Sequence, residues 1–536
     1  MGSTDKEKDH KPFFDRTKWD NKAQYILTCV GFCIGIGAFL IPYLILLVLE
    51  GMPLLFLEFA IGQHPRKGSV GVWQAINPYL GLVSLLIGLY YNTLIAWIMW
   101  YFFNSFQSPL PWTQCPLNEN KTGYMDECQR SSTVDYFYYR VTLNTSTSIS
   151  ESGGLHWPVV VCLLVAWTTI GLCYIRGISS SGKAVYVTAI LPYIVLAIFL
   201  VRGLTLKGAV TGIKFLFTSD VDELVKPTTW LDAGAQVFYA FSLAWGALIS
   251  FSSYNPVQYE HILILHSIYA AMVTYTIIGF RATEKYEQCI SDNIQTLLNA
   301  FNLPETSITQ NNYDEEFRHL NGTYPETVME LDITPCDMQR LLSEGTGLAF
   351  IVFTEAITKM PGAPVWSVLF FVMLLCLGIS TLIGNIEGVV VPLKDLGVFP
   401  KTWPQETFTA AVIIVCHHSS FAQHSGFYWP TLFDNFAGSV PLLCIGLFEM
   451  IAVVYIYGID RFFMTGSKPG IYWQVTWRFT SPLIILDHQE KFPILDSVPY
   501  PSWINAVIWI DLILMCMFSV IVLTFVMQIT VKQPNG

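Results

Sequence analysis

Long apolar runs, separated by short polar loops, dominate the chain. A helix that spans a bilayer needs about 20 apolar residues. The runs that reach or approach this length cover residues 25–56, 79–106, 157–175, 184–201, 231–254, 262–280, 365–391, 440–459 and 503–527. Two weaker runs, 408–416 and 479–486, are too short to span alone. The pattern predicts an all-α integral membrane protein, whose first run holds one long helix or two short ones.

The composition supports a membrane protein and excludes several other classes. Charged residues make up 13% of the 536 residues, against about 25% in an average globular chain. The net charge of −11 argues against binding to nucleic acid. Residues 282–344 hold twelve acidic and three basic side chains and so carry most of that charge. The rest of the chain is nearly neutral.

Basic residues in alternate loops predict the orientation in the membrane. They lie in the N-terminal tail and in the loops around residues 66–67, 176–183, 394–401 and 461–468. Short loops on the cytoplasmic side carry an excess of Lys and Arg. This places two long polar segments, 107–156 and 282–364, outside the cell.

The two outer segments carry further marks of an extracellular location. Asn120, Asn144 and Asn321 each begin an Asn-X-Ser/Thr sequence, the acceptor for N-glycosylation. Each segment also holds two cysteines, Cys115 and Cys128 in the first and Cys289 and Cys336 in the second. Disulfides persist in oxidising compartments. We therefore expect one local disulfide in each loop.

The chain lacks the motifs of hydrolysis and of ATP-driven transport. It has no phosphate-binding loop, no Gly-X-Ser-X-Gly turn and no His-Glu-X-X-His sequence. An enzyme is therefore not expected. Glycines instead interrupt two apolar runs, at residues 33–37 and 242–246. Interrupted helices at corresponding positions of two halves indicate a secondary transporter, although glycine also simply permits close helix packing.

Several polar groups lie inside the apolar runs. The hydroxyls of Ser380 and Thr381 are neutral oxygen ligands of the kind that sodium accepts. Acids within a membrane span are functional candidates by default. For Glu50 and Glu58 we instead expect a structural hydrogen bond to the backbone, because both lie towards the inner end of a helix. Glu387, Glu449 and Asp511 are the other acids inside the runs.

Motifs along most of the chain carry a resemblance to a known family. They include Glu-Gly-Met-Pro at 50–53, Gly-Leu-Tyr-Tyr-Asn-Thr at 88–93 and Gly-Asn-Ile-Glu-Gly at 384–388. Further matching stretches are 18–25, 58–63, 104–112, 115–120, 202–208, 235–238 and 250–255. The chain resembles neurotransmitter:sodium symporters of the epithelial neutral amino acid branch, found in kidney and intestine. The similarity covers residues 18–509.

This resemblance implies a fold and an activity. The fold is of the LeuT type, with up to twelve transmembrane helices in two inverted five-helix repeats plus two further helices. The activity is sodium-dependent symport of neutral amino acids across the plasma membrane, apical in epithelia. The implied organisation is a cytoplasmic tail over 1–22, one transporter domain over 23–528 and a short cytoplasmic tail over 529–536.

The resemblance also assigns site residues. The implied substrate-binding residues are Gly35, Tyr91, Tyr239, Ser242 and Trp245. The implied sodium ligands are Gly31, Cys33, Ile34, Leu377, Ser380 and Thr381. Asp434 occupies the position of an outer-gate acid, Cys115–Cys128 matches the family's loop disulfide, and Tyr43 and Gln236 match positions of a chloride site. No organic cofactor is implied, and sodium is the coupling ion.

The chain departs from the family pattern at the first sodium site. After Gly37 it lacks the segment with the family's Asn ligand and the Arg partner of the outer-gate acid. Ala240 replaces a family Ser, and Leu263 replaces a family Asn. Helices 1, 3, 9 and 11 are expected to be shortened. We predict that the chain binds at most one sodium, near Ser380, with little or no concentrative uptake.

Two functions and several partners follow as expectations. The first function is sodium-dependent neutral amino acid symport. The alternative is a transporter-like protein that does not transport, such as a splice product, a decayed paralogue or an incomplete gene model. The expected partners are the amino acid substrate, the lipid bilayer and a single-span membrane protein of the collectrin type. No nucleic acid partner is expected.

Overall fold

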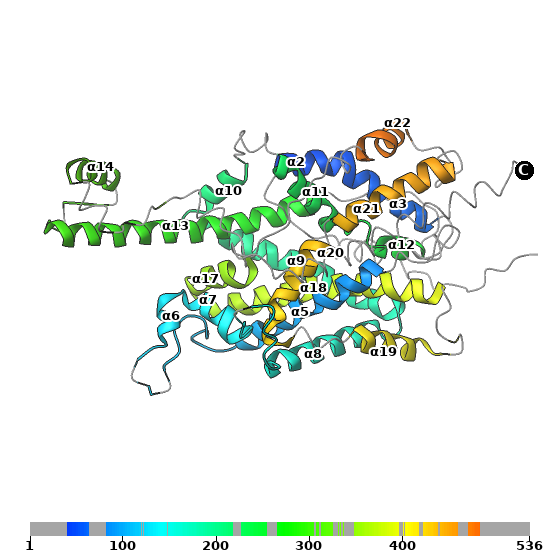
Figure 1. The fold of residues 1–536 in the computed structure, drawn as a ribbon, viewed down its shortest axis with the longest axis horizontal. Coiled ribbons are helices and arrows are strands. Elements are labelled where there is room, and N and C mark those ends of the chain that lie inside the picture. The colour runs from blue at the N-terminus through cyan, green and yellow to red at the C-terminus, as the bar shows by residue number, and fades with distance from the viewer. Residues whose placement is uncertain are drawn as a thin grey trace, which may run out of the picture.

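The computed structural model describes 40–63, 82–118, 120–121, 123–146, 148–217, 227–254, 265–304, 307–309, 312–324, 331, 333, 336, 348–395, 400, 403–416, 422–437, 440–458 and 470–482. The described part is almost wholly helical (Figure 1). Its only β contacts are two isolated bridges, Leu117 with Tyr124 and Leu155 with Gln423.

The first half of the chain forms α2 (Leu40–Leu46), η1 (Leu47–Gly51), α3 (Met52–Gln63), α5 (Leu82–Asn104), α6 (Asp126–Arg130), α7 (Thr133–Tyr136), η2 (Phe137–Thr142), α8 (Trp157–Tyr174), α9 (Ile178–Leu204), α10 (Ala209–Phe217), α11 (Pro227–Phe241) and α12 (Ala247–Ser252). The second half forms α13 (Leu265–Phe301), α14 (Tyr313–Thr323), η4 (Leu348–Val352), α17 (Phe353–Thr358), α18 (Ala363–Asp395), α19 (Gln405–Cys416), η6 (His424–Phe427), α20 (Tyr428–Ala437), α21 (Val440–Ile451), η7 (Ala452–Gly458), α22 (Ile471–Val475) and η9 (Thr476–Thr480).

Within the described residues, four helices are long and apolar enough to cross a membrane. They cover Pro42–Gln63, Trp157–Tyr174, Ser180–Leu204 and Ala363–Val391. Each lies largely within an apolar run of the sequence. Local residues set some of their limits: a proline follows the first residue of α8, where its missing N–H costs no helical hydrogen bond. Gly177, with φ +62°, turns the chain between α8 and α9.

Three apolar clusters hold the helices together, and α5 and α18 contribute to all three. The first cluster joins α2, α3, α11, α12, α21 and η9. The second joins α5, α9 and α18 to the first half of α13, and the third joins α5 and α18 to α8 and α19. In Figure 1 α5 and α18 accordingly run through the middle of the bundle.

Helix α13 extends far beyond the apolar run that predicted it. It is unbroken over 37 residues and carries a small apolar cluster at its far end, where α14 packs (Figure 1). Near its middle the backbone touches that of α10. A Cβ atom on Gly279 would lie 2.5 Å from the carbonyl oxygen of Gly208 and 2.6 Å from the amide nitrogen of Gly212. Only glycine permits this approach.

The end of the first outer loop is fastened to the segment before α20. The amide of His156 donates to the carbonyl of Ala422 at 2.8 Å, and that of Ser146 donates to the carbonyl of His424 at 3.0 Å. The Tyr428 hydroxyl donates to the carbonyl of Ser146 at 2.8 Å. We call this contact between 146–156 and 422–428 the outer latch.

Candidate functional site

The break expected at 242–246 is present and separates α11 from α12. Ser242, Ala244 and Gly246 have φ values of +51°, +62° and +76°. Residues other than glycine rarely adopt this left-handed region, and strain of this kind concentrates at functional sites. The side chains of Ser242 and Trp245 are both buried. The broken backbone is thus enclosed by the surrounding helices.

A buried carboxylate fixes the break. Oε1 of Glu58, on α3, accepts the backbone N–H of Ala244 at 2.7 Å. Helix α3 also lies against α12, since a Cβ on Gly62 would come within 2.2 Å of the Ile249 carbonyl oxygen. The expected backbone hydrogen bond of Glu58 is therefore confirmed. The same expectation is wrong for Glu50, because both of its buried carboxyl oxygens lack a hydrogen-bond partner.

The sodium candidates on α18 occupy one helical turn. The Thr381 hydroxyl donates to the carbonyl oxygen of Leu377 at 3.1 Å. The Ser380 side chain is 1% exposed, and its Oγ atom has no hydrogen-bond partner. A buried polar atom without a hydrogen-bond partner is costly, so this hydroxyl oxygen is a candidate to bind a ligand. The three oxygens are of the neutral kind that suits a sodium ion.

Helix α5 faces α18 with further buried polar side chains. Tyr91 is half-buried and packs against both the first and the third apolar clusters. Asn92 and Thr93 follow it and are fully buried, and the side chains of Asn92, Thr93 and Asn385 lack hydrogen-bond partners. No site role had been assigned to these three. Their position as polar residues within an apolar run is the sequence signal that could have identified them as site candidates.

Several candidates cannot be compared with the structure. Gly31, Cys33, Ile34, Gly35 and Leu263 lie outside the described residues. Tyr239, Asp434 and Asn321 lie on α11, α20 and α14, but their side chains are not described. Tyr43 is buried on α2, and Gln236 is half-buried on α11, which packs against α2. The structure therefore describes the α5, α12 and α18 sides of the candidate site.

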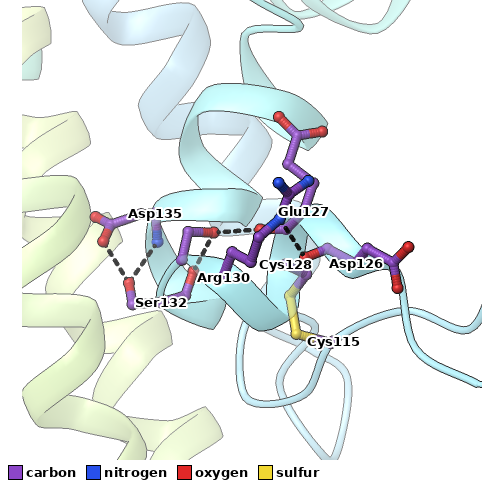
Figure 2. The surroundings of a disulfide bond; sticks show 8 residues. Cys115, Asp126, Glu127, Cys128, Arg130, Ser132 and Asp135 are labelled. Atoms are coloured by element: carbon purple, nitrogen blue, oxygen red, sulfur yellow. Dashed lines mark hydrogen bonds between the residues drawn. A yellow bond between two sulfur atoms is a disulfide. The ribbon is translucent and has the colours of Figure 1, made fainter.

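The outer loops contain both expected cysteine pairs as disulfides, Cys115–Cys128 and Cys289–Cys336. The first pair lies beside α6 and α7, where Ser132 caps α7 by accepting the amide of Asp135 at 3.0 Å (Figure 2). Among the predicted glycosylation positions, Asn120 is exposed, whereas Asn144 is half-buried with φ +47°.

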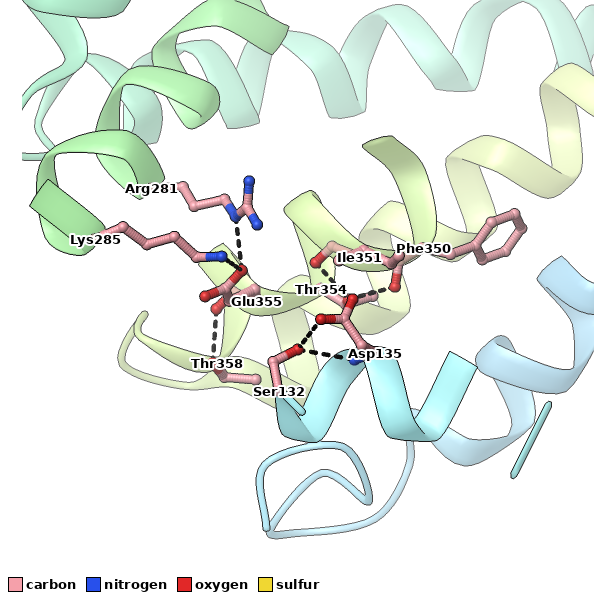
Figure 3. A network of polar contacts seen from close by, with 9 residues as sticks. All are labelled: Ser132, Asp135, Arg281, Lys285, Phe350, Ile351, Thr354, Glu355 and Thr358. Atoms are coloured by element: carbon pink, nitrogen blue, oxygen red, sulfur yellow. Dashed lines mark hydrogen bonds and ion pairs between the residues drawn. The ribbon is translucent and has the colours of Figure 1, made fainter. Parts of the chain in front are cut away.

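Ionic contacts join α17 to α13. Glu355, on α17, accepts from Arg281 Nε at 2.6 Å and lies 3.5 Å from Lys285 Nζ (Figure 3). The Arg281 side chain is 9% exposed, so this pair is shielded from solvent more than a surface pair is. At the outer latch, burial and, to a smaller extent, the neighbouring His424 lower the pKa of His156.

Helices packed around a buried break, with unpaired oxygens opposite it, define a membrane-embedded carrier protein of the secondary-transporter class. The comparison with known families gives the same class more specifically. Residues 16–533 match the description "Sodium:neurotransmitter symporter family". The chain belongs to this family.

Named relatives in three mammals are similar over nearly the whole chain. The chain is 54% identical to the mouse "Sodium-dependent neutral amino acid transporter B(0)AT1", covering 92% of this chain and 88% of the relative. It is 45% identical to rat "Sodium-dependent neutral amino acid transporter B(0)AT3", over 92% and 90%. It is 47% identical to the human "Inactive sodium-dependent neutral amino acid transporter B(0)AT3", over 92% and 88%.

Proposed function

We propose that the chain is a sodium-dependent symporter of neutral amino acids in the plasma membrane. The observation that carries the proposal is the meeting of three elements at one place. The break between α11 and α12 supplies unwound backbone, α18 packs against α12 and supplies Ser380, and α5 packs against α18 and supplies Tyr91. Unwound backbone binds a substrate carboxylate through N–H groups and a cation through carbonyl oxygens. The named relatives support the same substrate class.

Each side chain has a stated role in this proposal. Tyr91 donates to the substrate carboxylate together with amides freed at Gly35. Tyr239, Ser242 and Trp245 enclose the substrate from the α11–α12 side. One sodium is held by Leu377, Ser380 and Thr381 with backbone or thiol groups of Gly31, Cys33 and Ile34. Asp434 closes the outer side, and Tyr43 and Gln236 supply a chloride site.

The finer architecture is part of the proposal. The fold has twelve helices with two inverted repeats, and helices 1, 3, 9 and 11 are shortened. The tails at 1–22 and 529–536 are cytoplasmic. The protein is apical and has a collectrin-type partner. The alignment with the mouse relative runs over 555 positions, more than the 536 residues of this chain. Gaps therefore fall within this chain, which supports the interpretation that helices are shortened.

Uptake by purified protein tests the function. Proteoliposomes containing the protein should take up labelled leucine weakly and only under an inward sodium gradient, and choline in place of sodium should abolish the uptake. Ser380→Ala should raise the sodium concentration needed for half-maximal uptake by about tenfold, because one buried ligand is lost. Ser367→Ala is the matched control, since Ser367 is equally buried on α18 but bonds Ser105 at 2.7 Å. Equal uptake in sodium and choline would contradict the proposal.

A non-transporting protein is the second candidate. Two observations favour it: Ala240 is buried where the family has a hydroxyl, and one relative is named as inactive. The same proteoliposomes separate the two candidates. Binding of leucine without accumulation identifies the non-transporting protein, whereas sodium-driven accumulation excludes it.

A further inference from the structure

Glu50 is the one acid of the first spanning helix that neither the fold nor the proposed transport site uses. Its side chain is 1% exposed, and neither carboxyl oxygen has a hydrogen-bond partner. It lies within Pro42–Gln63, a span that is long and apolar enough to cross a membrane.

Glu50 occupies a widened helical turn that other groups hold in shape. In this π turn the amide of Met52 donates to the carbonyl of Leu47, five residues back. Three side chains of the 472–481 segment donate to neighbouring carbonyls: Tyr472 to Val48, Ser481 to Leu49 at 2.8 Å and Trp477 to Pro53 at 2.8 Å. The backbone around Glu50 is therefore fixed without any help from its carboxyl group. Such turns occur frequently at functional sites.

The surroundings of the turn are apolar. Leu47 and Leu54, on either side of Glu50, are buried in the first apolar cluster together with Val237 and Phe241. A Cβ on Gly51 would lie 2.5 Å from Cγ1 of Val237, so α11 is in direct contact with the turn. A carboxylate in such a place keeps its charge only with a cation beside it.

Titratable and charged groups occur on every element that packs against the turn. They are Tyr43 on α2, Glu58 on α3, Asp232 and Tyr239 on α11, Tyr472 on α22 and Arg478 on η9. Among those whose side chains are described, Glu58 is bound to Ala244. Tyr472 donates its hydroxyl to a backbone carbonyl. Arg478 forms no ion pair with Glu50.

We propose that Glu50 is a proton-binding site within the membrane, separate from the sodium residues on α18, and that it holds its proton at neutral pH. The proton removes the charge that the apolar surroundings disfavour. The step is a simple protonation: a proton from water adds to one carboxylate oxygen, and the carboxyl group becomes neutral. No other group of the protein reacts. The inference does not depend on whether the chain transports amino acids.

Infrared difference spectra of the full chain in lipid nanodiscs test this directly. At pH 7 the wild type minus Glu50→Gln spectrum should show the carbonyl stretch of an un-ionised carboxylic acid. Glu406→Gln, at the exposed start of α19, is the matched control and should lack this band. If the Gln variant does not fold, Glu50→Met provides the subtraction. A carboxylate band in place of the acid band overturns the proposal.

The pH dependence of unfolding provides an independent test. An acid that is neutral in the fold binds its proton more tightly than it does in the unfolded chain. The wild type therefore loses stability relative to Glu50→Gln as the pH rises above the pKa that this carboxyl group has in the unfolded chain. The ratio of the two unfolding constants should change by up to tenfold per pH unit. A ratio that instead follows sodium concentration at fixed pH would mean that a metal cation, not a proton, occupies the site.

Discussion

Tyr174, at the C-terminal end of α8, donates its hydroxyl to a carboxyl oxygen of Glu387 on α18. The hydroxyl of Tyr254, just after α12, donates to the other oxygen of the same carboxyl group. All three side chains are buried. One carboxyl therefore joins the half-helix after the break to two long helices.

Removing either hydroxyl should weaken the protein. Tyr174→Phe or Tyr254→Phe leaves one buried oxygen of Glu387 without its donor, at a cost of about 1–3 kcal/mol. Thermal unfolding followed by size-exclusion chromatography measures the loss. Tyr324→Phe, in which the side chain is 52% exposed, is the control and should unfold like the wild type. Equal melting temperatures for all three variants would show that Glu387 is not anchored by these hydroxyls.

The hydroxyl of Tyr91 should matter for substrate affinity and not for stability. Tyr91→Phe removes one hydrogen bond to the substrate carboxylate, which costs about 1.5–3 kcal/mol, or roughly 10- to 100-fold in affinity. Leucine binding to purified protein measures the change. Tyr90→Phe is the matched control, because Tyr90 is the next residue but stacks on Phe433. An unchanged affinity for Tyr91→Phe would place the carboxylate elsewhere.

The replaced ligands of the first sodium site should limit sodium coupling. A sodium ion that lacks several oxygen ligands within the bilayer has no water to replace them, and its desolvation costs several kcal/mol. We expect uptake by the unmodified chain to be weak and to depend on a single sodium. Restoring the missing helix-1 segment together with Ala240→Ser and Leu263→Asn should raise sodium-dependent uptake. Robust uptake with a two-sodium dependence in the unmodified chain would mean that other residues supply the missing ligands.

The two disulfides should stabilise their loops to different extents. The sequence separations are 13 residues for Cys115–Cys128 and 47 for Cys289–Cys336. The chain-entropy model gives about 3 and about 4 kcal/mol for loops of these lengths. Paired Cys→Ser variants, compared by proteolysis of the outer loops, measure the difference. Peptide mapping without reduction should recover both linked pairs, and free thiols at 115 and 128 would contradict the first.

The outer latch should loosen in acid. Burial holds the pKa of His156 below its ordinary value of 6.5, so the folded loop takes up a proton less readily than the unfolded loop does. The latch is therefore fully stable above about pH 6.5 and loses stability as the pH falls below this value. Hydrogen exchange at the amides of Ser146 and His156, corrected for intrinsic rates, should increase at pH 5.5. His156→Gln should remove the pH dependence, whereas His319→Gln on the exposed face of α14 should leave it unchanged.

The sequence was most informative where the physics is local. Apolar length predicted the four spanning helices that the structure describes, since a membrane span must satisfy its own backbone hydrogen bonds. Ser242, Ala244 and Gly246 show why the break was visible: small residues interrupt an apolar run. The cysteines of each outer loop are close in sequence, so their pairing needed no knowledge of the fold.

Local sequence patterns could not predict the contacts between segments that are distant in the chain. Glu50 and Glu58 look alike in sequence, yet only Glu58 finds a backbone donor, because α3 happens to face the broken backbone. The partners of Glu387 are separated from it by 213 and 133 residues. The helical extension of α13 was also missed, since its outer half is polar and packs against the segment around α14 that follows it.

The close glycine contact between α10 and α13 can act as a pivot point for α13. Helix α13 continues unbroken from Gly279 to Phe301, and a rise of about 1.5 Å per residue makes this arm roughly 33 Å long. A tilt of about 10° at the glycines would carry the tip of such a rod by roughly 6 Å. The Cys289–Cys336 disulfide and the cluster around α14 move with the rod, because both are attached to it. A small rotation at the glycines would thus become a large displacement at the far end of α13.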